Sequence, residues 1–470
     1  MTGSGTNRLC RRGCRQRSAA RSFRVWTAAA VASVMAVSSA GAQAPEKPAV
    51  PLLRTYVRLA DYGFKPEHDR DANAVLVERP KAGPNARFVV ISTHPKNRNN
   101  FEYFTGDIMA ARGYRVVEVN DYGPETAEDL LVPIAAAVRY ARSLPGVEKV
   151  ILVGHSGGGP VLSYYQEIAE NGPAACQISN RIAPCDAAEL TGMPPADALL
   201  LLEANIGAPH RLMALDPAVG PGNPRVRDPA LDMYSPANGF DPKTDTARYG
   251  QPFLKRYFAG MHARNAALLA EVGGKLKAIE DDTGPFKDDE PLLIPGMSES
   301  SSGARINMAD PTVLACTRHP HMVLKADGRM AREVVPVIRP PRATPAKKRD
   351  TLDSTAQVMT VREFLSMSAV RTTPDFALTQ DSIEGIDWRS SGNSPVGNVE
   401  SIRVPTLVMA GNCMIHFIPL ETVFDHSAAP DKEFVAVDGA DHDFEACRPE
   451  YGDTQKRAFD YVDAWLAKRF

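Results

Sequence analysis

The stretch around Ser156 constrains the fold of this chain more than any other. An apolar run of strand type, residues 149–153, ends at Gly154, and a segment compatible with a helix begins after Gly158. Between them lies the spacing Gly-x-Ser-x-Gly, with Ser156 at its centre. A strand that turns directly into a helix holds this residue on a strained tip, where glycines avoid collisions of a Cβ atom. The helix directs its first N–H groups beside Ser156, which favours an anion there.

Strand-like and helix-like segments alternate on both sides of this motif. Strand-type runs occur at 74–77, 87–93, 114–119, 149–153, 198–202, 404–410 and 433–437, and helix-type segments at 101–112, 126–142, 160–170 and 453–470. Short connections between alternating elements predict an α/β fold with a mainly parallel sheet flanked by helices. Ligands bind at the carboxyl ends of strands in such sheets, where Ser156 and His94 both lie.

The alternation stops between residues 207 and 402. This stretch carries a helix-like piece at 251–277, a polar segment rich in Pro and Ser, a possible hairpin at 323–337 and a linker rich in Pro, Lys and Arg. So long a stretch without alternation is typical of an insertion over a binding site. We therefore expect a core formed by residues 45–206 and 403–470, with residues 207–402 inserted as a cap or lid.

The N-terminus has the pattern of an export signal. Several arginines between residues 8 and 24 precede an apolar, alanine-rich stretch to about Ala40, and Ala42-Gln43-Ala44 follows. This pattern predicts a signal peptide at 1–44 and a periplasmic or extracellular protein with no stable membrane span after cleavage. The apolar stretch, roughly 16 residues long, is shorter than a membrane-spanning helix requires.

Export would place the remaining cysteines in an oxidising environment. Cys176 with Cys185 would close a short loop, and Cys413 with Cys447 would join two loops near the end of the chain. Buried free thiols are the alternative. Together with Cys316 these cysteines are odd in number, so we expect at least one to stay free or to pair between chains.

Neither the net charge nor the histidine spacing favours a nucleic-acid-binding protein or a metalloprotein. The formal net charge of −2 gives no indication of a nucleic-acid partner. His319 and His321 have the spacing of a ligand pair, but no third ligand follows at a recognisable distance. We therefore expect neither a metal nor a cofactor.

Motifs at four strand ends make the chain resemble the α/β-hydrolase fold superfamily, of the serine esterase and lipase type with a large cap insertion. The resemblance covers about residues 70–205 and 400–470, and the order with nucleophile first and histidine last matches the family. The motifs are Gly154-His-Ser-Gly-Gly158, His94 after an earlier strand, the stretch from Val404 to Gly411, and Gly439-Ala-Asp-His442.

A serine hydroxyl needs a base within reach, and His442 is the candidate because its loop leaves a strand near the same edge of the sheet. The resemblance implies that the N–H of Gly157 is one oxyanion donor and that the loop after His94 supplies the second. Family members usually have His-Gly there. Pro95 has no N–H, so this donor would be Lys96.

The carboxylate partner of His442 is where the sequence departs from the family. Gly411-Asn-Cys-Met414 has no carboxylate where members commonly carry Asp. Glu203 ranks first, because it ends the strand after the nucleophile helix, from which some members supply the acid. Glu421, Asp425 and a Ser-His dyad remain open. We expect Asp441 and Asp443 to point away from His442, His155 to be structural, and His416 to have no assigned role.

The sequence thus predicts an exported serine hydrolase that cleaves a carboxylic ester through an acyl-enzyme. Ser156, His442 and Glu203 would be catalytic, with Gly157 and Lys96 as oxyanion donors. A lactonase or amidase using the same residues is one alternative, and a catalytically inactive binding protein is another. The partner would be a small-molecule or lipid-like ester; the sequence predicts no oligomeric state.

Overall fold

The structure is a computed structural model that describes residues 50–64, 73–95, 99–120, 126–220, 226–297, 306–339, 356–414 and 417–470. The predicted signal peptide at 1–44, Lys96 and His416 lie outside the described residues. Export and the second oxyanion donor therefore stay predictions. Among the helices that are described, none is long and apolar enough to cross a membrane.

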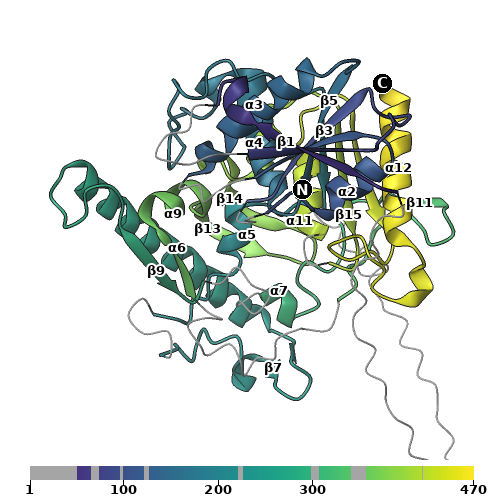
Figure 1. Cartoon of the computed structure of the whole chain (residues 1–470). Coiled ribbons are helices and arrows are strands. Elements are labelled where there is room, and N and C mark those ends of the chain that lie inside the picture. Colours follow the sequence, from purple (N-terminus) through teal and green to yellow (C-terminus); the bar gives the residue numbers. More distant parts are fainter. Residues whose placement is uncertain are drawn as a thin grey trace, which may run out of the picture.

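A ten-stranded sheet forms the centre of the molecule (Figure 1). In spatial order its strands are β1 (Leu53–Arg58), β2 (Asn73–Glu78), β4 (Arg115–Val119), β3 (Phe88–Thr93), β5 (Lys149–His155), β6 (Ala198–Leu202), β15 (Thr406–Gly411), β16 (Lys432–Val437), β10 (His321–Leu324) and β11 (Met330–Glu333). Strands β4 to β10 in this order pair in parallel, whereas β1, β2 and β11 join antiparallel at the edges. The predicted mainly parallel sheet is confirmed.

Helices cover both faces of the sheet (Figure 1). Along β5, Val150 and Leu152 pack on one side, against the layer that contains α3 (Ala127–Ser143), α4 (Gly158–Asn171) and α11 (Phe417–His426). Ile151 and Val153 pack on the other side, with α2 (Phe104–Ala111) and α12 (Thr454–Arg469). A strand buried on both faces needs apolar residues at every position, which is why this segment is continuously apolar.

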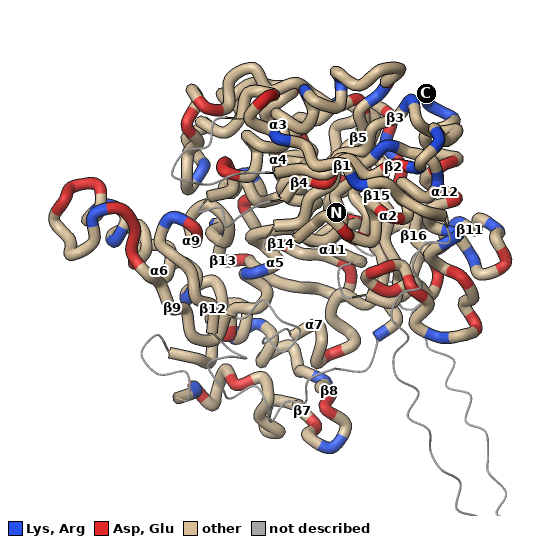
Figure 2. The backbone as a smooth tube through the Cα atoms, in the orientation of Figure 1, with Lys and Arg blue, Asp and Glu red and all other residues tan. Residues whose placement is uncertain are grey.

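The segment between β6 and β15 lies mostly beside the sheet (Figure 1). Its long helix α6 packs against β13 and α9. Lys and Arg (blue) and Asp and Glu (red) are interspersed along the described part of the chain (Figure 2). The elements of this segment are α5 (Ala208–Leu212), β7 (Phe240–Asp241), β8 (Thr246–Ala247), α6 (Gln251–Glu280), β9 (Pro291–Pro295), α7 (Ile306–Ala309), β12 (Ala356–Thr360), α9 (Val361–Met367), β13 (Arg371–Leu378), β14 (Ile383–Asp387) and α10 (Pro395–Asn398).

One part of this segment belongs to the main sheet. Strand β10 pairs in parallel with β16, and β11 follows it as an antiparallel partner. The hairpin predicted at 323–337 therefore contributes to the core sheet, although it lies within the 207–402 region expected to form the cap. Shared sheet hydrogen bonds tie this part of the insertion to the core.

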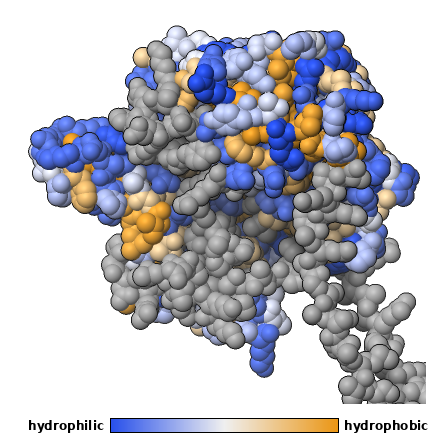
Figure 3. All heavy atoms as spheres, in the orientation of Figure 1, coloured by the Kyte–Doolittle hydropathy of each residue, from blue (hydrophilic) through white to orange (hydrophobic). Residues whose placement is uncertain are grey.

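An apolar patch is exposed on the two-stranded sheet of β9 and β12, at the lower left of Figure 3. Leu293 and Val358 are directly paired across these strands. Their exposed fractions are 52% and 71%. Exposed apolar neighbours of this kind often mark a contact surface.

Two disulfides stabilise loops of the core. Cys176 bonds to Cys185 with a Cα–Cα distance of 5.6 Å, and Cys413 bonds to Cys447 with a Cα–Cα distance of 6.4 Å. Both distances lie in the usual range for disulfides. These are the two pairings considered from the sequence.

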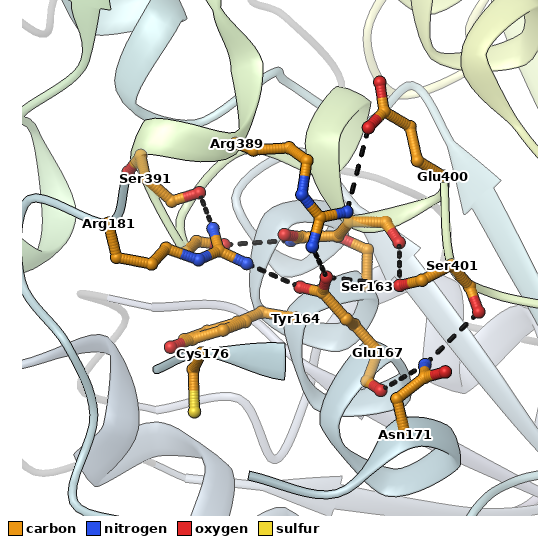
Figure 4. A network of polar contacts seen from close by, with 12 residues as sticks. Ser163, Tyr164, Glu167, Asn171, Cys176, Arg181, Arg389, Ser391, Glu400 and Ser401 are labelled. Atoms are coloured by element: carbon orange, nitrogen blue, oxygen red, sulfur yellow. Dashed lines mark hydrogen bonds and ion pairs between the residues drawn. The ribbon is translucent and has the colours of Figure 1, made fainter. Parts of the chain in front are cut away.

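A buried ion pair joins helix α4 to two other segments (Figure 4). Arg181 Nη2 lies 2.8 Å from Glu167 Oε2, and both side chains are fully buried. Arg181 also donates to the carbonyl of Ser391, and Arg389 lies 3.4 Å from the other oxygen of Glu167. The network therefore links the helix after Ser156 to the loop at Arg181 and to the end of the inserted segment.

We expect Glu167→Met to lower the free energy of unfolding by about 3–5 kcal/mol, because it leaves the buried Arg181 cation without its carboxylate. The double variant Glu167→Met/Arg181→Met should recover much of this loss. Urea unfolding measures both effects. Lys277→Ala is the control, since its pair with Asp281 is exposed and contributes at most ~1 kcal/mol. Equal losses in the free energy of unfolding for Glu167→Met and Lys277→Ala would show that the buried pair of Glu167 and Arg181 matters no more than an exposed one.

Candidate active site

Ser156 occupies a strained turn between β5 and α4. Its φ angle is 49°, in the left-handed region that residues other than glycine rarely adopt. The flanking glycines are needed because a Cβ on Gly154 would lie 2.7 Å from the Cα of Gly159, and one on Gly158 would lie 2.2 Å from the carbonyl oxygen of Thr93. The close approach of β3, β5 and α4 thus fixes the serine at the carboxyl edge of the sheet.

His442 lies on the loop that follows β16. Gly439 and Phe444 turn this loop with φ angles of 75° and 60°. The carboxylate of Asp441 accepts backbone N–H bonds from Asp443 and Glu445, at 3.0 and 2.9 Å. These local bonds form a compact turn, and half-buried His442 stands within it.

Residues 412 and 413, near the position where the family commonly carries its acid, brace this loop instead. Asn412 accepts the N–H of Gly439 at 2.7 Å and donates to Asp438 at 3.0 Å. Cys413 donates its N–H to the carbonyl of Ala440 at 2.9 Å. Together with the Cys413–Cys447 disulfide, these bonds attach the His442 loop to the end of β15.

Glu203 is the carboxylate that faces His442. It directly follows β6, with a φ angle of 46°, and is fully buried. Its Oε2 lies 3.6 Å from His442 Nδ1, and its Oε1 accepts the N–H of Gly411. The Nδ1–Oε2 distance is an ion-pair distance, longer than a hydrogen bond.

The two groups shift each other's pKa. Burial raises the pKa of Glu203, and His442 opposes this rise. Burial alone would lower the pKa of His442, but the adjacent carboxylate of Glu203 outweighs it, so the pKa of His442 is raised. A histidine with a raised pKa beside a buried carboxylate is suited to accept a proton.

The other candidate acids have different surroundings. Glu421 accepts the N–H groups of Arg318 and His319 at 2.8 and 3.0 Å, and its Oε1 lies 2.7 Å from His321 Nε2. Burial and the charge of Glu421 raise the pKa of Asp425, and the nearby His319 and His321 act in the opposite direction. Both carboxylates therefore lie on α11 and face the segment at the start of β10 instead of His442. Asp443 was expected to point away from His442, yet its carboxylate lies within 4.8 Å of a ring nitrogen.

The predicted oxyanion donor Gly157 faces His94. The Gly157 N–H donates to His94 Nε2 at 3.4 Å, and His94 Nδ1 lies 2.9 Å from the carbonyl oxygen of Pro95. A carbonyl oxygen only accepts, so Nδ1 carries the proton and Nε2 presents its lone pair. The structure thus brings His94 to the Gly157 donor, while the Lys96 donor lies outside the described residues.

His155 is a functional candidate that the sequence interpretation treated as structural. Its ring is buried, with Nδ1 2.7 Å from the Tyr103 hydroxyl and Nε2 2.7 Å from the carbonyl oxygen of His442. The rings of His155 and His442 have centroids 4.6 Å apart. The only sequence signal was that a polar residue precedes Ser156 at the end of an apolar strand.

One cluster of the described residues has the composition of a metal site: His155, His442 and Asp443, with ligand atoms within 4.8 Å of one another. Both ring nitrogens of His155 already have hydrogen-bond partners. The lone pair of a neutral imidazole is what binds a metal, and here the hydroxyl of Tyr103 uses it. The cluster therefore fits a hydrogen-bonded site better than a metal centre.

Two features decide the architecture. Ser156 lies on a sharp strand-to-helix turn of a mostly parallel sheet, and His442 follows β16, the last parallel strand in the sequence. The chain has the α/β-hydrolase fold. Its sequence matches no family model and no curated protein.

Several solved structures are similar to the chain at low sequence identity. Esterase B from Lactobacillus Rhamnosis is 11% identical, with 91% of this chain and 88% of that chain covered and a TM-score of 0.39. Est1E from Butyrivibrio proteoclasticus is 12% identical, with 88% and 98% covered and a TM-score of 0.34. The monoacylglycerol lipase of Paleococcus ferrophilus is 14% identical, with 82% and 96% covered and a TM-score of 0.33.

We expect Gly158→Ala to destabilise the protein by about 1–3 kcal/mol, because its Cβ would collide with the main chain of Thr93. Urea unfolding measures the loss. Gly273→Ala is the matched control: it lies in α6 with no atom within 4 Å of the added Cβ, and it should stabilise by up to ~1 kcal/mol. A Gly158→Ala variant as stable as the wild type would show that the turn is not tightly packed.

Proposed function

We propose that this protein is a serine hydrolase that cleaves a carboxylic ester through an acyl-enzyme. The observation that carries the proposal is the 3.6 Å approach of buried Glu203 to His442 at the sheet edge that holds the strained Ser156. A nucleophile, a base and a carboxylate behind the base form the arrangement that activates a serine. Glu203 also supplies the acid whose apparent absence suggested an inactive binding protein.

In the proposed reaction, Ser156 Oγ attacks the ester carbonyl while His442 takes its proton. Glu203 stabilises the imidazolium that results. The developing oxyanion replaces His94 as the acceptor of the Gly157 N–H, with Lys96 as the proposed second donor. His442 then protonates the leaving alcohol, and a water activated by His442 releases the acid.

Export is part of the proposal. It is supported by the signal-like sequence at 1–44 and by two disulfides, since disulfides persist in oxidising compartments. The substrate is a small-molecule or lipid-like ester.

The decisive test is hydrolysis of short nitrophenyl esters by the wild type and by Ser156→Ala. We expect the variant to lose at least ~10³-fold in kcat and all labelling by a fluorophosphonate probe, because the nucleophile is gone. Ser163→Ala, which changes another serine near the start of α4, should keep both. Equal rates for the wild type and Ser156→Ala would refute the proposal.

A second test separates the candidate acids. We expect Glu203→Gln to lower kcat by roughly 10³–10⁴-fold, as in other serine hydrolases with an amide in place of the acid. His442 must be neutral to act as base, so kcat/KM rises with pH through its pKa. That midpoint should lie above the ordinary ~6.5 in the wild type. Glu203→Gln removes the charge that raises this pKa most, so the midpoint should move to lower pH.

Glu421→Gln is the matched control for this pH profile. It alters a buried carboxylate bonded to His321, so it should leave the midpoint in place even if it lowers stability. The assignment of the acid would be wrong if Glu421→Gln shifted the midpoint and Glu203→Gln did not.

A further inference from the structure

We propose that His155 is a positioning residue that holds the His442 loop against the nucleophile turn, and that the Tyr103 hydroxyl fixes the ring tautomer this requires. The inference rests on the proposed function, because it concerns the placement of the proposed base. It assigns a role to the position between Gly154 and Ser156.

The direction of each hydrogen bond follows from its partners. The main-chain carbonyl of His442 only accepts, so His155 Nε2 carries a proton and donates at 2.7 Å. A neutral imidazole then has its lone pair on Nδ1, which accepts the Tyr103 O–H at 2.7 Å. Both nitrogens of the buried ring are thereby satisfied, and only this tautomer allows both bonds.

The bond to His442 joins the two halves of the site directly. His155 is the residue next to the nucleophile, and its partner is the residue that carries the base. Other bonds hold the loop on either side: Asn412 holds Gly439, and Thr454 Oγ1 donates to the carbonyl of Phe444 at 2.6 Å. The His155 bond holds position 442 itself, so it bears most directly on where the imidazole stands.

Both partners keep the required protonation state. Burial lowers the pKa of His155 well below its ordinary value, and the neighbouring His442 and His94 lower it further, against the bond to the His442 carbonyl. Burial raises the pKa of Tyr103, and the charge of Asp443 raises it further, so the hydroxyl stays a donor. A neutral His155 also avoids a second positive charge beside His442 when that base is protonated.

The sign of the expected pH effect comes from the groups around His442. Glu203 faces it from the end of β6, Asp441 and Asp443 lie beside it in its own loop, and His155 packs against it from β5. Loosening the loop would weaken the contact with Glu203, which is the main factor that raises the pKa of His442. The pKa of His442 should then fall. The acid limb, meaning the rise of kcat/KM with pH on the acidic side of the profile, should move to lower pH.

The test compares His155→Phe, which keeps a flat ring but has no N–H, with His155→Gln, whose amide N–H can reach the position of Nε2. Rates are expressed per serine labelled by fluorophosphonate. We expect His155→Phe to lose about 10–100-fold in kcat with KM changed less than ~2-fold, because a small displacement of the base has this effect. The acid limb should move to lower pH, and His155→Gln should restore part of both changes.

A merely structural role gives a different result. Loss of folded protein lowers the number of labelled serines but leaves kcat per labelled serine and the pH limb unchanged. His155→Phe with wild-type kcat per site and the wild-type limb would therefore overturn the inference. If hydrolysis by the wild-type enzyme did not depend on Ser156, the proposed function itself would be refuted, and the role of His155 with it.

Tyr103→Phe tests the inference even if His155→Phe does not fold. It removes only the hydroxyl that selects the tautomer, so we expect a several-fold loss of kcat and a limb shift in the same direction. Tyr114→Phe is the control, because it removes another partly buried hydroxyl. This hydroxyl donates to Asp463 at 2.9 Å, and Tyr114 precedes β4 at its amino end, away from the carboxyl edge that holds Ser156. Equal pH limbs in the wild type, Tyr103→Phe and Tyr114→Phe would overturn the tautomer argument.

Discussion

The close approach of three main-chain segments around Ser156 is the constraint on which the rest of the site depends. Gly154 touches the start of α4, and Gly158 leaves no room between α4 and the end of β3. This packing holds a non-glycine residue at a positive φ angle, a conformation that is stable only when its surroundings enforce it. The large sheet, buried on both faces by helices, supplies that enforcement.

The proposed base and its proposed carboxylate partner reach this turn through different kinds of support. Glu203 directly follows the central strand β6 and has a positive φ angle, so its position follows from the sheet. His442 is carried by a loop, and a disulfide, the Asn412 side chain and the His155 ring hold that loop in place. A loop with so many anchors can carry a catalytic side chain with the precision of a regular element.

Much of this arrangement follows from local patterns in the sequence. Continuous apolar runs identify the parallel strands, because strands covered on both faces have no polar side. Gly154 and Gly158 indicate the turn because a Cβ at either position would collide with a neighbouring main chain, and the alternating strands and helices around them support this interpretation. The hairpin of β10 and β11 shows the limit of such reasoning: it was predicted as a hairpin, but nothing local indicates that it pairs with β16 instead of lying in the inserted cap.

The sequence by itself determined the parallel sheet, the turn at Ser156 and the candidate base His442, because periodicity and glycine spacing are local properties. It left three carboxylates open. Only the tertiary structure decided that Glu203 faces His442 while Glu421 and Asp425 lie near His319 and His321. It also revealed the bonds from Tyr103 to His155 and from His155 to His442. These contacts join residues 52 and 287 positions apart, so only the folded chain brings them together.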